Sequence, residues 1–323
     1  MRRRGLLPCL LLITACGDAA PGTTPDAGAG AASADAPGNV FFTLQQAGAV
    51  GRLGGRETPA GAQMTYLDVS ADGTQVIASA TGEDAVYLID VRSGVVLDTI
   101  PVGSAPKGVR FAPYPNFAFV ANEGAGTVGV IVLGRGEMVQ EVPVGPTPHA
   151  IAFDANGDVM YVTVQGANRI AVVDLEMLRV LGTIEVPGHP HNLAISPDGN
   201  TLYVTLLDRR ELVAVSIAGN TVGGRTPLPE PHYGIALSPD GSRAYVTGMA
   251  GSVMRVIDTA SMRALADVEV GTAPHGVVTN RAGDEIYVSV AGSDEIVVVD
   301  ARNNEVKRRE KVGRGPFWLA TVK

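Results

Sequence analysis

The chain has few of the residues that many catalytic and metal-binding proteins rely on. Two cysteines occur in 323 residues, Cys9 and Cys16. The sequence after Cys16 therefore offers no disulfide, no thiolate nucleophile and no cysteine metal site. It contains no Gly-x-Ser-x-Gly elbow and no Cys-x-x-Cys-His haem motif, and serine is scarce. No apolar run is long enough to span a bilayer as a helix.

Positive charge is also in deficit. The chain has 25 basic and 33 acidic residues, a net charge of −8. Three of the arginines lie in the first 15 residues, which carry no acidic side chain; without them, 22 basic residues face 33 acidic ones, giving −11. This balance disfavours nucleic acid as a partner, and a single-stranded nucleic-acid binder is the least favoured function.

The N-terminus has the pattern of a targeting segment. Arg2-Arg3-Arg4 precedes the short apolar run from Leu6 to Ile13, and Ile13-Thr14-Ala15-Cys16 resembles a bacterial lipobox. That resemblance implies cleavage before Cys16 and lipidation of this residue. We predict a signal peptide at 1–15, a disordered tether at 16–38 that carries the lipidated Cys16, and a folded domain at 39–323. The alternative is an ordinary cleavable signal that ends near Ala15 or Ala20.

A lipid anchor would place the protein in the cell envelope. We expect it on the periplasmic side of a membrane, with the outer membrane as the first choice, or at the cell surface. The expected state is a monomer whose partners are the membrane, through the lipid, and an envelope protein or polymer.

A repeat of 42 residues dominates the rest of the sequence. Tyr161-Val162-Thr163 recurs as Tyr203-Val204-Thr205 and Tyr245-Val246-Thr247, and the apolar segments around these strands recur with them. A period near 40 with several short apolar strands in each unit is typical of a β-propeller. Turn motifs follow the same period, as in Ser196-Pro197-Asp198-Gly199. The repeated aspartates are therefore expected to cap turns rather than to catalyse.

Six complete units and two partial ones account for the folded domain. The complete units start near Met64, Lys107, His149, His191, Tyr233 and His275. The segment from Val40 to Leu53 resembles middle strands without a first strand, and Gly315 to Val322 resembles a first strand with nothing after it. Joining them would complete a seventh blade and remove the exposed edges of an open array. We predict an all-β, seven-bladed propeller whose closing blade is composite, with a poor or missing outermost strand.

On these motifs the chain resembles the YVTN-repeat family of seven-bladed propellers, over about residues 39–323. It departs from the family at the fourth letter, where Asn122 is the only asparagine. The resemblance implies the fold. It does not select a function, because relatives include surface-layer proteins, exported propellers, DNA-binding propellers, lactonase-like enzymes and propeller parts of quinoprotein and copper enzymes.

All five histidines fall near one position of the repeat, at the start of each innermost strand. This position should surround one mouth of the central channel, and the loops after the second strands should reach the same face. His189 lies two residues from it. The predicted ligand-binding residues are Lys107, Glu123, His149, Gln165, His191, Asp208, His232, Tyr233, His275 and Phe317.

The histidines allow two interpretations. Imidazoles that converge on an axis can hold copper or zinc, which predicts a Cu or Zn site formed by His149, His191 and His275. Relatives with a copper-containing propeller use rings of histidine in this way. The alternative is structural: Pro-His-Gly is the residue pattern that this repeat prefers at a tight turn, with the ring nitrogens bonded to neighbouring loops.

The function that the sequence favours is binding or scaffolding by a membrane-anchored propeller of the bacterial cell envelope, with the ligand at the channel mouth. The alternative is an enzyme, either a lactonase-like hydrolase or a metal-dependent activity at the histidine ring.

Overall fold

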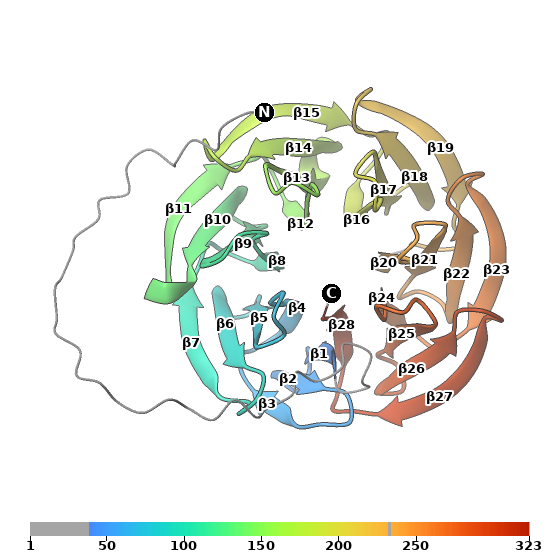
Figure 1. Ribbon diagram of the computed structural model, residues 1–323, viewed down its shortest axis with the longest axis horizontal. Coiled ribbons are helices and arrows are strands. Elements are labelled where there is room, and N and C mark those ends of the chain that lie inside the picture. The colour runs from blue at the N-terminus through green and yellow to red at the C-terminus, as the bar shows by residue number, and fades with distance from the viewer. Residues whose placement is uncertain (1–38, 232–233, 323) are drawn as a thin grey trace, which may run out of the picture. The chain divides into compact units, whose positions relative to one another are not determined.

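The computed structural model describes residues 39–231 and 234–322, which form a seven-bladed β-propeller. Seven four-stranded antiparallel sheets surround one axis (Figure 1). The predicted signal peptide, tether and lipidated Cys16 lie outside the described residues, as do His232 and Tyr233. Within the described ranges, no helix has the length and apolar character needed to cross a membrane.

Each blade runs from an innermost strand beside the axis to an outermost strand at the rim. Blade 1 contains β4 (Met64–Val69), β5 (Gln75–Ala80), β6 (Ala85–Asp90) and β7 (Val96–Pro101). Blade 2 contains β8 (Pro106–Phe111), β9 (Phe117–Asn122), β10 (Thr127–Val132) and β11 (Glu137–Pro143). Blade 3 contains β12 (Pro148–Phe153), β13 (Val159–Val164), β14 (Arg169–Asp174) and β15 (Arg179–Glu185).

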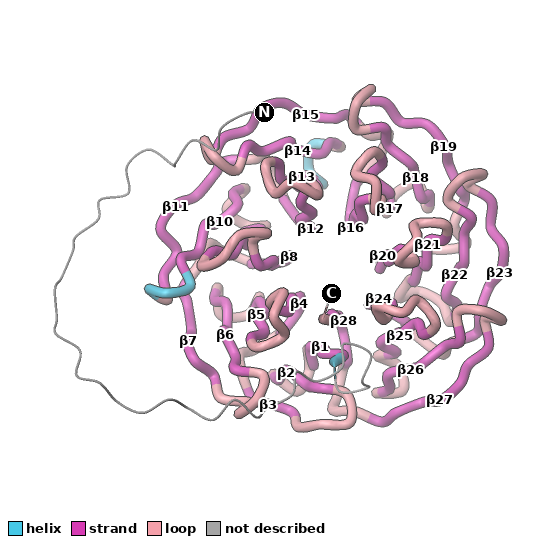
Figure 2. The backbone as a smooth tube through the Cα atoms, viewed as in Figure 1, coloured by secondary structure: helices cyan, strands magenta, loops and turns pink. Residues whose placement is uncertain are grey.

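The second half of the ring repeats this pattern. Blade 4 contains β16 (Pro190–Ile195), β17 (Thr201–Leu206), β18 (Glu211–Ser216) and β19 (Thr221–Pro227). Blade 5 contains β20 (Gly234–Leu237), β21 (Arg243–Thr247), β22 (Val253–Asp258) and β23 (Arg263–Glu269). Blade 6 contains β24 (Pro274–Thr279), β25 (Glu285–Val290), β26 (Glu295–Asp300) and β27 (Glu305–Lys311). Figure 2 shows that strands make up nearly all the regular structure; the 3-10 turns η2 (Leu133–Arg135) and η3 (Gln165–Ala167) follow strands of blades 2 and 3.

The composite closing blade, blade 7, is confirmed. Its strand order is β28 (Pro316–Thr321), β1 (Val40–Leu44), β2 (Ala49–Arg52) and β3 (Glu57–Pro59), so the innermost strand comes from the C-terminal end. Phe42 pairs with Leu319 across the junction. The outermost strand is present but has only three residues, in line with the expectation of a poor one.

Burial follows the position of a strand within its blade. The second strands are almost completely buried, as in β13, because both of their faces pack against neighbouring blades. The outermost strands are mostly exposed: in β15 only Ile184 is buried. Residues of successive blades form the apolar clusters between them, as Phe119, Met160 and Val173 do.

A series of buried hydroxyl groups holds the innermost strands in place, and four of them, on Thr43, Thr163, Thr247 and Ser289, also donate to the next blade. We call it the hydroxyl series; it comprises Thr43, Ser79, Thr163, Thr205, Thr247 and Ser289, one on each second strand except in blade 2, where Ala121 stands. Thr163 accepts a hydrogen bond from the Ala150 N–H of its own blade at 2.9 Å and donates one to the His191 carbonyl of the next blade at 2.8 Å.

The hydroxyl is needed because the innermost strand has a bulge at this point. In blade 3 the pairing of β12 with β13 shifts between Pro148 and Ile151. A bulge leaves a backbone N–H without a partner on the adjacent strand, and it turns the side chain that precedes it. The Thr of the Tyr-Val-Thr motif thus supplies the missing acceptor and holds the residue that faces the axis.

The predicted turn role of the repeated aspartates is also confirmed. Asp198 accepts hydrogen bonds from the Ser196 hydroxyl and the Asn200 N–H, which lower its pKa to about 2. Asp90, Asp174 and Asp258 each accept a backbone N–H three residues further along the chain.

Candidate functional site

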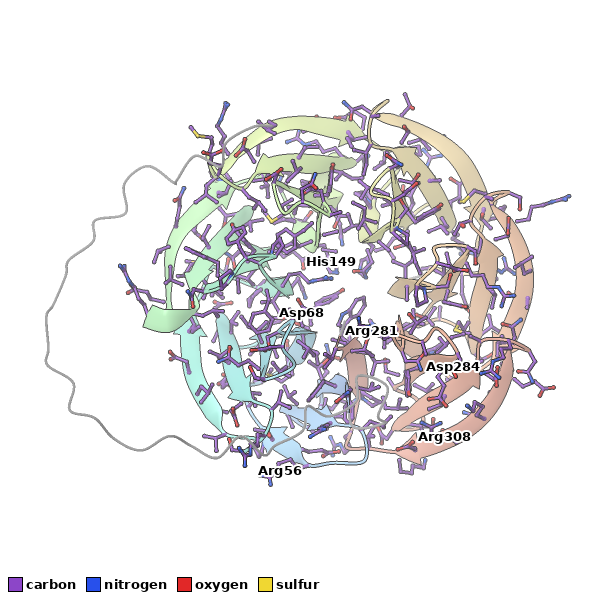
Figure 3. The ribbon with its side chains drawn as sticks, viewed as in Figure 1. Arg56, Asp68, His149, Arg281, Asp284 and Arg308 are labelled. Carbon is purple, nitrogen blue, oxygen red and sulfur yellow. The ribbon has the colours of Figure 1, made fainter. Side chains whose placement is uncertain are left out.

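One end of the propeller carries both groups of residues that the sequence singles out. The first group opens the innermost strands, and the second follows the second strands; antiparallel pairing places both at the same end. Backbone hydrogen bonds fix them to each other, as from the Glu123 N–H to the Ala105 carbonyl and from the Gln165 N–H to the Thr147 carbonyl. We call this end the mouth. Figure 3 shows His149 at the inner end of its blade, beside the axis.

Three of the predicted residues come together at the mouth between blades 2 and 3. Glu123 Oε2 lies 3.5 Å from Lys107 Nζ and 3.6 Å from His149 Nδ1. The Lys107 and Glu123 side chains are 22% and 26% exposed, whereas that of His149 is 8% exposed. Solvent therefore reaches the ammonium and the carboxylate, and the imidazole supports the carboxylate from the buried side.

A group of six rings occupies the axis beneath the mouth, and we call it the axial cluster. Its members are Tyr66, His149, His191, His275, Phe317 and Trp318. The His149 and His191 rings lie 4.0 Å apart between centroids, and those of His275 and Phe317 lie 3.7 Å apart. Tyr66 packs against His149, Phe317 and Trp318.

Tyr66 ties the axial cluster to the mouth. Its hydroxyl lies 2.6 Å from His149 Nε2, although the two residues belong to blades 1 and 3. The intervening blade 2 has Gly108 at the position of Tyr66, and a Cβ there would lie 2.6 Å from the His149 carbonyl oxygen. A hydroxyl that donates to Nε2 leaves the imidazole proton on Nδ1, which faces Glu123.

Burial and charge set the protonation states. Burial lowers the pKa of His149, and Lys107 adds to this effect, while Glu123 opposes it. Burial, with the charge of His149, lowers the pKa of His275 to about 3. Burial also raises the pKa of Glu123, but contact with His149 and the charge of Lys107 outweigh it, so the pKa falls below its ordinary value. At neutral pH both imidazoles are thus neutral and Glu123 is ionised.

The other predicted residues have different surroundings. The Asp208 carboxylate accepts the His189 N–H at 2.7 Å, which links the loop of blade 4 to the start of its own innermost strand. The Gln165 side-chain nitrogen is buried and makes no hydrogen bond to the described residues. His191 Nδ1 lies 2.9 Å from the Asn192 amide. His189 is exposed at the surface.

The metal site stays a prediction of the sequence. Among residues 39–231 and 234–322, no three His, Cys, Asp or Glu side chains are grouped so that they could hold a metal ion. His149 directs its two ring nitrogens at Tyr66 and Glu123.

The sequence reasoning missed Tyr66, Asn192 and Trp318. All three stand one residue after the histidine position of the repeat, where the other described blades have glycine or alanine. The change from small to large side chains at this position was the signal that they fill the axis.

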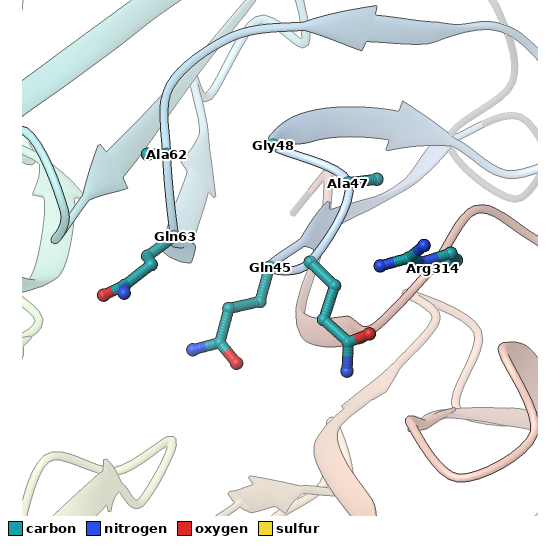
Figure 4. Close-up of a pocket in the computed structure, with 7 residues that line it drawn as sticks. Gln45, Ala47, Gly48, Ala62, Gln63 and Arg314 are labelled. Carbon is teal, nitrogen blue, oxygen red and sulfur yellow. The ribbon is translucent and has the colours of Figure 1, made fainter.

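The sequence reasoning also missed a pocket at the mouth, between blade 7 and blade 1. This seam pocket has a volume of about 690 Å³ and is lined by Gln45, Gln46, Ala47, Gly48, Ala62, Gln63 and Arg314. Figure 4 shows the Gln45, Gln63 and Arg314 side chains projecting from three separate segments around one open space. Gln45 follows the second strand of its blade, as Glu123 and Gln165 do in theirs.

Comparison with known proteins agrees with this architecture. The chain is similar to a solved structure described as Kuenenia stuttgartiensis hydrazine synthase, with a TM-score of 0.71 and 21% identity over 79% of this chain and 88% of that one. No curated protein sequence matches it. The family described as "Lactonase, 7-bladed beta-propeller" matches residues 38–224, more than half of the chain. The protein therefore belongs to the lactonase family of seven-bladed β-propellers.

Proposed function

We propose that the protein hydrolyses a lactone, or a related cyclic ester, at the mouth, with Glu123 as the general base. The observation that carries this proposal is the partly exposed Glu123 carboxylate, which lies 3.5 Å from Lys107 Nζ and 3.6 Å from His149 Nδ1. A carboxylate beside an ammonium group is suited to activate water and to stabilise a developing oxyanion. Membership of the lactonase family supports the same reaction class.

The reaction needs only water and the ring ester. Water attacks the carbonyl carbon while Glu123 takes its proton, and the Lys107 ammonium stabilises the oxyanion of the tetrahedral intermediate. The intermediate collapses as the ring C–O bond breaks, and Glu123 returns the proton to the leaving alkoxide. The product is an open-chain hydroxy acid.

His149 and Tyr66 act as positioning residues. Both are buried, and the 2.6 Å contact between the Tyr66 hydroxyl and Nε2 directs the Nδ1 proton toward Glu123. This arrangement fixes one carboxylate oxygen and leaves the other face of the group to the solvent side. The lowered pKa of Glu123 keeps the base ionised at neutral pH.

Hydrolysis of a panel of γ- and δ-lactones by the full-length chain tests the proposal. Acid release is followed with a pH indicator, against spontaneous hydrolysis. Glu123→Gln should lower kcat by about 100-fold or more, the usual size of a general-base contribution. Glu137→Gln is the matched control, because Glu137 belongs to the same blade and forms an exposed ion pair with Arg135. The proposal fails if no lactone is hydrolysed above background, or if Glu123→Gln keeps full activity.

Ligand binding without chemistry is the second candidate. Contact with His149 and the charge of Lys107 lower the pKa of Glu123, and a carboxylate of lowered pKa is a weaker base. The same groups would then recognise a polar ligand of the cell envelope. Saturable binding of a lactone to the wild type with no turnover, and weaker binding to Glu123→Gln, would favour this role.

Anchoring through a lipid on Cys16 is proposed on the N-terminal pattern described above. Cells fed a radiolabelled or alkyne-tagged fatty acid should incorporate the label into the wild-type chain and not into Cys16→Ala, and only the wild type should sediment with membranes. Equal labelling of both chains would contradict the anchor.

A further inference from the structure

We propose that the seam pocket is a second recognition site, which binds the carboxylate and hydroxyl groups of a sugar acid. The inference stands apart from lactone hydrolysis, because none of the residues that line the pocket belongs to the catalytic group of Lys107, Glu123 and His149. It rests on an unpaired guanidinium, on neighbouring amide side chains and on the size of the pocket.

The guanidinium of Arg314 supplies the charge. Arg314 is exposed, and within the described part of the chain its side chain makes no ion pair and no hydrogen bond. Two carboxylates lie near this segment, but both are engaged by its backbone: Glu57 accepts the Gly313 N–H and Asp294 accepts the Gly315 N–H. In a chain with 33 acidic and 25 basic residues, an arginine without a carboxylate partner at the mouth is suited to an anion from solution.

The backbone holds Arg314 against the loop that forms the other wall. The Ala47 N–H donates to the Arg314 carbonyl at 3.2 Å, and the Gln45 N–H donates to the Gly315 carbonyl at 2.8 Å. The pocket wall is therefore built by the two ends of the described chain together. Its shape depends on closure of the ring.

The amide side chains of Gln45, Gln46 and Gln63 supply the rest of the chemistry. Each amide presents both donors and an acceptor, which matches a sugar hydroxyl, since that group also donates and accepts. The planar guanidinium matches a carboxylate in a bidentate manner. A volume of about 690 Å³ lies within the range of small-molecule sites. Together these features fit a sugar ring that bears a carboxylate.

Isothermal titration of the full-length chain with D-galacturonate tests the site. D-galactose is the matched ligand, because it differs only in carrying a hydroxymethyl group in place of the carboxylate, and inorganic phosphate is the alternative oxyanion. We expect galacturonate to bind at least about tenfold more tightly than galactose, a difference of about 1.4 kcal/mol. Arg314→Gln should remove that difference, whereas Gln45→Ala should weaken both sugars.

Arg281→Gln is the control variant. Arg281 is also exposed, but it lies in the turn between β24 and β25, at the end of the propeller opposite the mouth. The proposal is overturned if galactose binds as tightly as galacturonate, if phosphate binds as tightly with the same dependence on Arg314, or if no ligand saturates at millimolar concentration. It is also overturned if Arg281→Gln has the effect of Arg314→Gln. Lactone hydrolysis by the same preparation reports separately on Glu123.

Discussion

Replacing Thr163 with valine tests the role of the hydroxyl series in joining the blades. Valine keeps the shape of the side chain and removes the hydroxyl, which is completely buried. The change leaves the Ala150 N–H and the His191 carbonyl without the partners that now lie at 2.9 and 2.8 Å. A buried polar group without a partner costs about 1–3 kcal/mol, so the two together should cost about 2–6 kcal/mol.

Such a loss is a large part of the stability of an ordinary domain, about 5–15 kcal/mol. Equilibrium urea unfolding measures it, with the fluorescence of the single tryptophan, Trp318 in the axial cluster, as one probe and circular dichroism as the other. Thr183→Val is the matched control, because Thr183 lies in the same blade on the exposed strand β15. If Thr163→Val destabilises the protein no more than Thr183→Val does, the hydroxyl does not join the blades.

Two further predictions concern the axial cluster. Tyr66→Phe should lower the free energy of unfolding by about 1–3 kcal/mol, because His149 Nε2 loses its buried partner. The same change should lower kcat for lactones more than it changes KM. An unchanged kcat would contradict the positioning role. The second concerns pH: His275 has a folded pKa of about 3, below its ordinary value of 6.5. A histidine whose folded pKa is depressed stays neutral in the native state while the unfolded chain takes up a proton below pH 6.5, so its contribution to stability is complete above pH 6.5 and is lost as the pH falls toward 3. Urea unfolding at intervals between pH 7 and pH 5 should show the free energy of unfolding falling by up to about 1.4 kcal/mol per pH unit because of this residue. His275→Phe should reduce the slope of unfolding free energy against pH. An equal slope in the variant would refute the assignment of this pH dependence to His275.

The fold could be predicted from the sequence because the residues that define each blade lie within one short segment, and the same pattern recurs along the chain. The residue pattern within each 42-residue unit predicts the strands and turns of that unit. The incomplete units at the two ends predict how the ring closes. Even the grouping of Lys107, Glu123 and His149 follows in part, since all three occupy positions that the repeat assigns to the mouth.

The axial cluster could not be predicted in the same way. Tyr66 and His149 are 83 residues apart, and their contact depends on how far a tyrosine reaches past the glycine of the intervening blade. The histidines were expected to line an open mouth, and the structure buries three of them against aromatic rings. The seam pocket was missed because Arg314 and Gln45 meet only after the ring has closed, across a junction that no repeat period spans.

The order in which the chain is made gives the closing blade one more consequence. Its outer strands emerge from the ribosome first among the described strands, yet the strand they need beside the axis, β28, is the last to be synthesised. Domains generally fold as units during synthesis at about 5–20 residues per second. Here the outer strands of blade 7 must wait until the six other blades have been synthesised, so a nascent chain that stalls before Pro316 leaves Phe42 and Leu44, which are buried in the closed ring, without the strand that pairs with them.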